Sequence, residues 1–118
     1  MARYRLAAPA KADIQSILRT SETRHGAEAR IRYRGLLAAA MRRVARDPFG
    51  ASTLDRSDLA PRLRSFHVRH GRNESREAPV AAPMHIVFYR LAGPDLIELI
   101  RMLHERMDLG RHVGAREE

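Results

Sequence analysis

The sequence predicts one α+β domain, in which an N-terminal strand and an α-helical hairpin precede an antiparallel β-sheet. Three observations predict this class: the chain has 118 residues, its first half holds two apolar blocks with helical spacing, and its second half holds three short segments rich in Val, Ile, Phe and Tyr. Because single domains most often contain roughly 100 to 150 residues, we expect a single domain over residues 1–118.

The first half is expected to form a strand followed by two helices. Residues 4–7 alternate in polarity and predict a short strand, and Pro9 suits the first turn of a helix because its missing N–H would be unpaired there. Gly26 ends this helix, and the second helix is expected to run from Ala27 to Arg46, before the sequence DPFG. The apolar faces consist of Ala10, Ile14, Ile17 and Leu18 in the first helix and of Ala29, Tyr33, Leu36, Leu37, Ala40 and Val44 in the second.

The second half is expected to cover these helices with three antiparallel strands, at residues 62–69, 84–91 and 95–104. A short turn containing Gly and Pro separates the last two strands, which predicts a hairpin. Residues 95–104 also fit a helical period, so a helix is the alternative to the last strand. Residues 70–83 lack an apolar period and are expected to form a flexible loop, and residues 114–118 a short charged tail.

The composition indicates a soluble, cytoplasmic protein with an anionic partner. The chain carries 22 basic and 14 acidic residues, a net charge of +8, and Lys11 is its only lysine. Arginine suits carboxylates and phosphates, so an acidic protein or a nucleic acid is the expected partner, although coding bias is an alternative cause of the arginine excess. The sequence contains no Cys, no signal peptide and no apolar run long enough to span a membrane.

The six histidines are not spaced as metal ligands. No HxH or HExxH pair occurs, and His67, His85, His104 and His112 come from different predicted segments. A GxSxG motif and a glycine-rich phosphate loop are also missing from the sequence. We therefore expect no metal and no cofactor, which leaves recognition, or metal-free general acid–base chemistry as in small ribonucleases.

The last two strands supply the candidates for acid–base chemistry: Tyr89, Arg90, Arg101 and His104. These side chains would meet if they shared one face of the predicted hairpin. Structural roles are the alternatives, with Tyr89 as a core aromatic residue and His104 as a partner of nearby backbone groups. Arg101 is expected either to face solvent or to pair with Glu98 or Asp108.

The order of the predicted elements and the end of the chain resemble a known family. The segments LRSFHVRH, PMHIVFYR and especially LIELIRMLHERMDLGRHV are similar to the RelE/ParE superfamily of bacterial type II toxins, and most similar to its ParE branch. The resemblance covers nearly the whole chain, from Tyr4 to Val113. Its most specific part is the apolar strand that closes in RxLHxxMDxxRH.

The resemblance implies a toxin that inhibits DNA gyrase and so blocks replication. It also implies a hetero-oligomer in which a cognate ParD-like antitoxin wraps the toxin with an acidic C-terminal segment. The alternative is a RelE-like endonuclease that cuts messenger RNA on the ribosome, because one fold hosts both activities. A lysine-based site on the sheet is impossible here, since Lys11 lies near the start of the first helix, and this favours the ParE interpretation.

The residues expected to function lie on the second helix, on the sheet or near the end of the chain. If the protein is a nuclease, the catalytic candidates are Arg64, Tyr89, Arg101 and His104. The candidates for contact with the antitoxin or the target are Arg30, Arg34, Arg62, Arg64, His67, Tyr89, Arg90, Arg101, His104, Arg106, Asp108 and Arg111.

Overall fold

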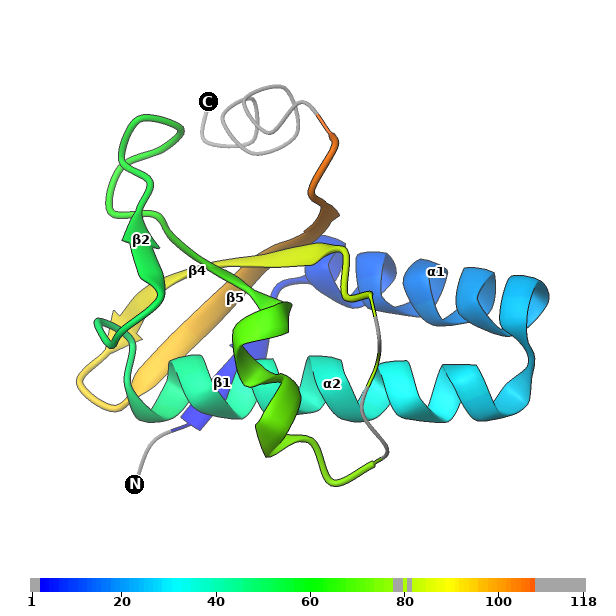
Figure 1. Cartoon of the computed structure of the whole chain (residues 1–118). Coiled ribbons are helices and arrows are strands. Elements are labelled where there is room, and N and C mark those ends of the chain that lie inside the picture. The colour runs from blue at the N-terminus through cyan, green and yellow to red at the C-terminus, as the bar shows by residue number, and fades with distance from the viewer. Residues whose placement is uncertain (1–2, 78–79, 81, 108–118) are drawn as a thin grey trace.

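Two antiparallel helices pack on one face of a five-stranded mixed sheet in the computed structural model, which describes residues 3–77, 80 and 82–107 (Figure 1). The elements in chain order are β1 (Arg3–Leu6), α1 (Ala8–His25), α2 (Ala27–Arg46), β2 (Thr53–Asp55), β3 (Arg64–His67), the 3-10 helix η1 (Val68–Glu74), β4 (His85–Gly93) and β5 (Leu96–His104). The strand order is β1-β5-β4-β3-β2. This architecture confirms the α+β class and the expected order of strand, helical hairpin and strands.

The helical hairpin follows the sequence expectation closely. Pro9 lies in the first turn of α1, and α2 has the expected bounds. Gly26 joins the helices with φ 93°, a left-handed conformation that favours glycine because a side chain there would be strained. Neither long helix in the described part of the chain carries an apolar stretch sufficient to cross a bilayer.

The sheet buries apolar side chains on both faces. One face packs against the helices in a cluster that includes Phe66, Val87, Tyr89, Leu99 and Met102. The opposite face is covered by residues 56–63, and its cluster consists of Ala60, Leu63, Phe88, Ile100 and Leu103. Burial on both faces explains why β5 reads as an almost continuous apolar run.

The hairpin of β4 and β5 is confirmed, and the helical alternative for residues 95–104 is wrong. β5 pairs with β4 along its length and with β1 over residues 96–99, so its backbone groups form the hydrogen bonds of a sheet. Its side chains divide between the two apolar clusters, with Leu99 in one and Ile100 in the other. A helix would bury only one such stripe, whereas the two-sided sheet buries both.

The pairing of β1 and the short strand β2 were not predicted. β1 runs parallel to β5, with Arg3 opposite Leu96 and Leu6 opposite Leu99, so the sheet is mixed rather than wholly antiparallel. The crossover through the helical hairpin allows this parallel pairing. β2 has only three residues and two of them are exposed, so no alternation of polarity marks it in the sequence.

The strand predicted at residues 62–69 is shorter than expected, and the loop predicted at residues 70–83 begins within a helix. Arg62 has φ 60°, which excludes it from an extended strand, and β3 starts at Arg64. After His67 the chain turns into η1, whose Val68 and Gly71 are buried. η1 packs against α2, and a Cβ added to Gly71 would lie 3.5 Å from the Cα of Ala40. Tertiary contact with α2 therefore stabilises a helical turn that has no apolar period of its own.

One carboxylate, that of Asp13, joins α1 to the part of β5 that β1 does not reach. β1 ends at Leu6, opposite Leu99, and the next backbone bond runs from the N–H of Ala7 to the carbonyl of Leu99. Further along β5, the Asp13 side chain accepts the backbone N–H of Met102 at 2.9 Å. It also accepts Nε and Nη2 of Arg101, at 2.7 and 2.9 Å. The Asp13 side chain thus supplies the hydrogen-bond acceptor that a longer β1 would have provided.

We expect Asp13→Ala to lower the free energy of unfolding by about 3 kcal/mol, because both side chains of the Asp13–Arg101 pair are largely buried and the Arg101 charge would lose this partner. Asp13→Asn retains an acceptor for the Met102 N–H and should cost less. Urea denaturation monitored by circular dichroism measures both losses.

Arg5→Ala is the matched control, since Arg5 of β1 also forms an ion pair with a residue of β5, Glu98, at 3.4 Å, but Arg5 is mostly exposed. It should cost less than about 1 kcal/mol. Equal losses for Asp13→Ala and Arg5→Ala would contradict a special role for Asp13.

Candidate functional site

Arg64 and Tyr89, two of the nuclease candidates, hold the turn after α2. The Tyr89 hydroxyl donates to the carbonyl of Pro48 at 2.5 Å, and the Arg64 Nε donates to the same carbonyl at 3.1 Å. Nη2 of Arg64 donates to the hydroxyl of Thr53 at 2.8 Å, and its guanidinium lies 4.8 Å from the ring centroid of Phe49. Both side chains therefore have structural partners.

Tyr89 is fully buried in the helix-side cluster, which agrees with its expected role as a core aromatic residue. Burial raises the pKa of its hydroxyl above the ordinary value of 10.0, although hydrogen bonding to Arg64 acts in the opposite direction. The hydroxyl consequently stays protonated at neutral pH. A general base in a nuclease would need the opposite shift.

The other two nuclease candidates lie elsewhere. Tyr89 and Arg64 pair with each other in the β3–β4 register, while His104 pairs with His85, four residues away along β4. Four residues of strand correspond to about 13 Å. The bond to Asp13 holds Arg101 against α1, a partner that the sequence analysis did not name. The structure therefore does not gather the four residues into one constellation.

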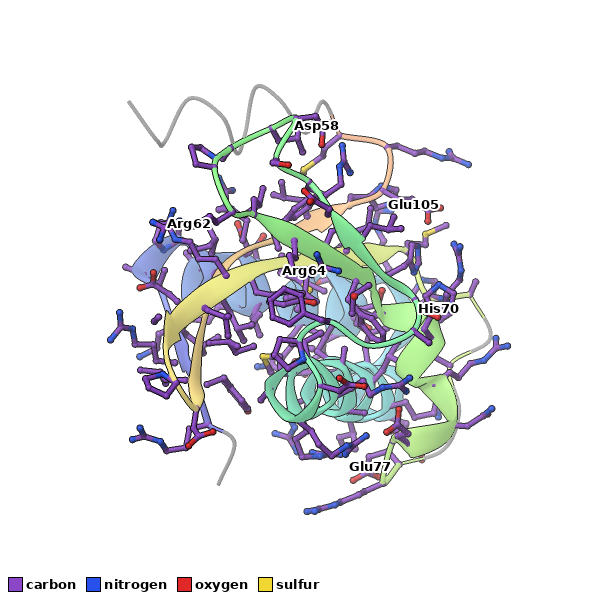
Figure 2. The ribbon with its side chains drawn as sticks, turned by 90° about the vertical axis from the view of Figure 1, so that its left-hand side faces the viewer. Asp58, Arg62, Arg64, His70, Glu77 and Glu105 are labelled. Atoms are coloured by element: carbon purple, nitrogen blue, oxygen red, sulfur yellow. The ribbon has the colours of Figure 1, made fainter. Side chains whose placement is uncertain are left out.

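Histidines gather at the other end of the strands, where β3 ends, β4 begins and β5 ends. Nε2 of His67 lies 2.5 Å from the Glu105 carboxylate, and this bond lowers the pKa of Glu105. His85 lies opposite His104, and their ring centroids are 5.4 Å apart. Figure 2 shows that Glu105 and His70 lie away from Arg62, which is on the opposite side of the view.

Burial beneath neighbouring side chains keeps His85 neutral. Desolvation lowers its pKa from 6.5 to about 4, and the nearby His104 and His67 act in the same direction, against the smaller opposing effects of Glu105 and Asp13. Nδ1 of His85 lies 2.6 Å from the Tyr33 hydroxyl, which comes from α2. Burial also raises the pKa of this hydroxyl, so the pair is uncharged at neutral pH.

A groove of about 880 Å³ opens beside these histidines, between the loop end of the helical hairpin and the edge formed by residues 80, 82, 84, 85, 104, 106 and 107. The hairpin projects past the sheet at this end (Figure 1). Apolar side chains and cations line the groove, and the described lining residues include no Asp or Glu. Its lining consists of Ser16, Ile17, Thr20, Ser21, Arg24, His25, Ala29, Arg32, Tyr33, Val80, Ala82, Met84, His85, His104, Arg106 and Met107.

Of the residues expected to contact a partner, His104 and Arg106 line this groove, and His67 lies at the same end of the sheet. Arg30 pairs with Glu22 on α1, whereas Arg34 lines a smaller cleft of about 250 Å³ on the other side of α2. The remaining candidates lie apart: Arg62 is exposed in the loop before β3, Arg90 lies opposite Glu98, and Asp108 and Arg111 fall outside the described residues.

Sequence reasoning did not assign a functional role to Tyr33, His85 or the arginines of the hairpin end, Arg24 and Arg32. The spacing of Tyr33 predicts that it lies on the apolar face of the second helix. In the structure its side chain does pack against the helix-side core cluster. The sequence gives no clear signal for the arginines, because Glu22 and Glu28 flank the hairpin turn together with them. The groove itself arises from tertiary packing.

A family comparison defines the class of protein. Residues 4–109 match the model of the ParE toxin of the type II toxin-antitoxin system, parDE. The chain therefore belongs to the ParE toxin family, as the resemblance of its final strand predicts.

Individual relatives agree with this family. Toxin ParE1 of Caulobacter vibrioides is 33% identical over 114 residues, which are 97% of this chain and 100% of the relative. Toxin ParE1 of Mycobacterium tuberculosis is 28% identical over 111 residues, which are 94% of this chain and 97% of the relative. The solved structure of a chromosomal ParDE TA system from P. aeruginosa shares the fold, with a TM-score of 0.62 at 15% identity, over 88% of this chain and 95% of that one.

We expect Tyr89→Phe to lower the free energy of unfolding by about 1 kcal/mol, because it removes one buried hydrogen bond and leaves the ring in place. Growth inhibition on expression in bacteria should remain. Urea denaturation and colony counts after induction measure the two effects. A variant that folds with unchanged stability but no longer inhibits growth would contradict the structural role of this hydroxyl.

The pKa of His85 predicts that the protein loses stability as the pH falls from 6.5 towards 4. In this window the unfolded chain binds a proton at His85 that the folded chain does not, so the free energy of unfolding decreases as the pH decreases. After allowance for solvent screening, the loss is on the order of 1 to 2 kcal/mol.

Replacement of His85 by Phe should flatten this dependence, which denaturation at a series of pH values measures. His70→Gln is the control, because His70 is mostly exposed and its pKa is lowered only by partial burial and nearby positive charges. An unchanged slope in His85→Phe would show that His85 is not the titrating group.

Proposed function

We propose that this protein is a toxin that inhibits DNA gyrase, and that a cognate antitoxin neutralises it by binding in the groove at the hairpin end. The observation that carries the proposal is the match of residues 4–109 to the ParE toxin family. The contacts of Arg64, Tyr89 and Arg101 support inhibition by binding rather than by catalysis, because each has a structural partner.

The groove supports the antitoxin part of the proposal. It combines apolar side chains such as Ile17 and Met84 with the cations Arg24, Arg32 and Arg106. An amphipathic acidic segment would bury its apolar residues between the helices and the sheet, and would place its carboxylates beside the arginines. The antitoxin would then form a hetero-oligomer with the toxin.

Two assays on the purified protein test the choice of target. We expect it to inhibit supercoiling by gyrase and to leave ribosome-bound messenger RNA intact. A parallel reaction with toxin already bound to its antitoxin should show normal supercoiling. Cleavage of messenger RNA without an effect on supercoiling would overturn the proposal in favour of a RelE-like nuclease.

A charge placed in the groove tests the antitoxin site. Thr20 is exposed on α1 and lines the groove, so Thr20→Glu should repel an acidic segment and weaken antitoxin binding by about tenfold, while inhibition of gyrase remains. Gln15→Glu is the matched control, since Gln15 is exposed on the same helix and is not a lining residue. Isothermal titration calorimetry measures both affinities, and equal binding by the two variants would exclude the groove.

A further inference from the structure

The hydrogen-bond partners of three histidines at this end of the sheet assign the ring proton to the same nitrogen. The backbone N–H of Arg69 donates to Nδ1 of His67 at 3.1 Å, and that of Arg106 donates to Nδ1 of His104 at 3.1 Å. A ring nitrogen that accepts a hydrogen bond has no proton of its own, so the proton of each neutral ring is on Nε2.

The third histidine, His85, reaches the same tautomer through Tyr33. The Tyr33 oxygen accepts the backbone N–H of Met84 at 3.1 Å and lies 2.6 Å from Nδ1 of His85. We assign Tyr33 as the donor in this contact, because its oxygen already accepts the Met84 N–H. When Tyr33 donates this proton to Nδ1, the proton of the imidazole is on Nε2.

The three Nε2–H groups differ in what they meet. That of His67 points to the carboxylate of Glu105. Those of His85 and His104 have no hydrogen-bond partner within the described part of the chain, and no buried side-chain nitrogen or oxygen there lacks a partner. Neither Nε2 atom is therefore fully buried, and both side chains line the groove.

We propose that His85 and His104 form a carboxylate-binding pair in the groove, which receives an Asp or Glu side chain of the amphipathic antitoxin segment. This inference rests on the proposed function, since it specifies which residues of the antitoxin site select the partner. His67 and Glu105 show the same contact within the chain: an imidazole with Nδ1 occupied donates Nε2–H to a carboxylate. Arg106 also lines the groove and adds positive charge.

The surroundings of the pair favour a peptide over a nucleic acid. Ile17, Val80, Met84 and Met107 line the groove, and a phosphate backbone has no apolar groups to cover them. An amphipathic helix or strand would cover them with its apolar face. A metal ion is disfavoured as the ligand, because it would need the unprotonated Nε2 atoms that the present tautomers do not offer.

The experiment uses short amphipathic peptides that each carry a single glutamate, placed at a different position in each peptide. A matched set carries glutamine at the same positions. Fluorescence anisotropy measures their binding to the folded toxin. At the position that faces the pair, the glutamate peptide should bind roughly tenfold more tightly than its glutamine counterpart, as expected for a charge-assisted hydrogen bond.

Four histidine variants separate recognition from packing. His85→Phe and His104→Phe should each reduce this preference to less than about twofold, with the affinity for the glutamine peptide unchanged. His104→Gln, which keeps an N–H donor, should retain much of the preference. His70→Phe is the control, because His70 is exposed on η1 and does not line the groove.

Three results would overturn the inference. They are a preference for glutamate that persists in both phenylalanine variants, a loss of binding that is equal for both peptides, and binding of a DNA duplex that excludes the peptides. Suppose that the antitoxin binds the toxin and that Thr20→Glu weakens this binding, while the histidine variants leave the preference for glutamate intact. In that case only the role of the histidine pair is refuted. If the antitoxin does not bind at all, the proposed function fails instead.

Discussion

The contact between Asp13 and the exposed edge of β5 determines how the helical hairpin sits on the sheet. β1 covers only the first part of β5, so an edge N–H at Met102 would otherwise face a helix without a partner. The carboxylate of Asp13 satisfies this group and also pairs with Arg101, which ties α1 to the sheet at a fixed point. The position of the rest of the hairpin follows from this anchor and from the apolar cluster beneath it.

The groove is a consequence of that geometry. Because α1 is attached near its start, its later turns extend beyond the sheet together with the beginning of α2 (Figure 1). The space between them and the ends of β4 and β5 is not filled by the described side chains. Tyr33 reaches across it to His85 and Met84, and so links the hairpin to the sheet at the floor of the groove.

The candidate residues divide according to their environment. Arg64 and Tyr89 hold the Pro48 turn, because both side chains donate to the part-buried carbonyl of Pro48. The histidine edge has the opposite character, since His85 and His104 bond through Nδ1 and neither Nε2 atom is fully buried. The donors and apolar surface of this edge support the proposed inhibition by binding.

The sequence by itself determined the hairpin of α1 and α2, the hairpin of β4 and β5, and the family, because helical period, turn residues and the final motif are local properties. Only the tertiary structure decided the parallel pairing of β1, the 3-10 helix η1 and the partner of Arg101. These depend on residues far apart in the chain, such as Asp13 and Met102, which no local pattern connects. The groove also depends on tertiary structure, since its histidines, tyrosine and arginines come from α1, α2, β4, β5 and the turn after β5, which meet only when the sheet and hairpin pack together.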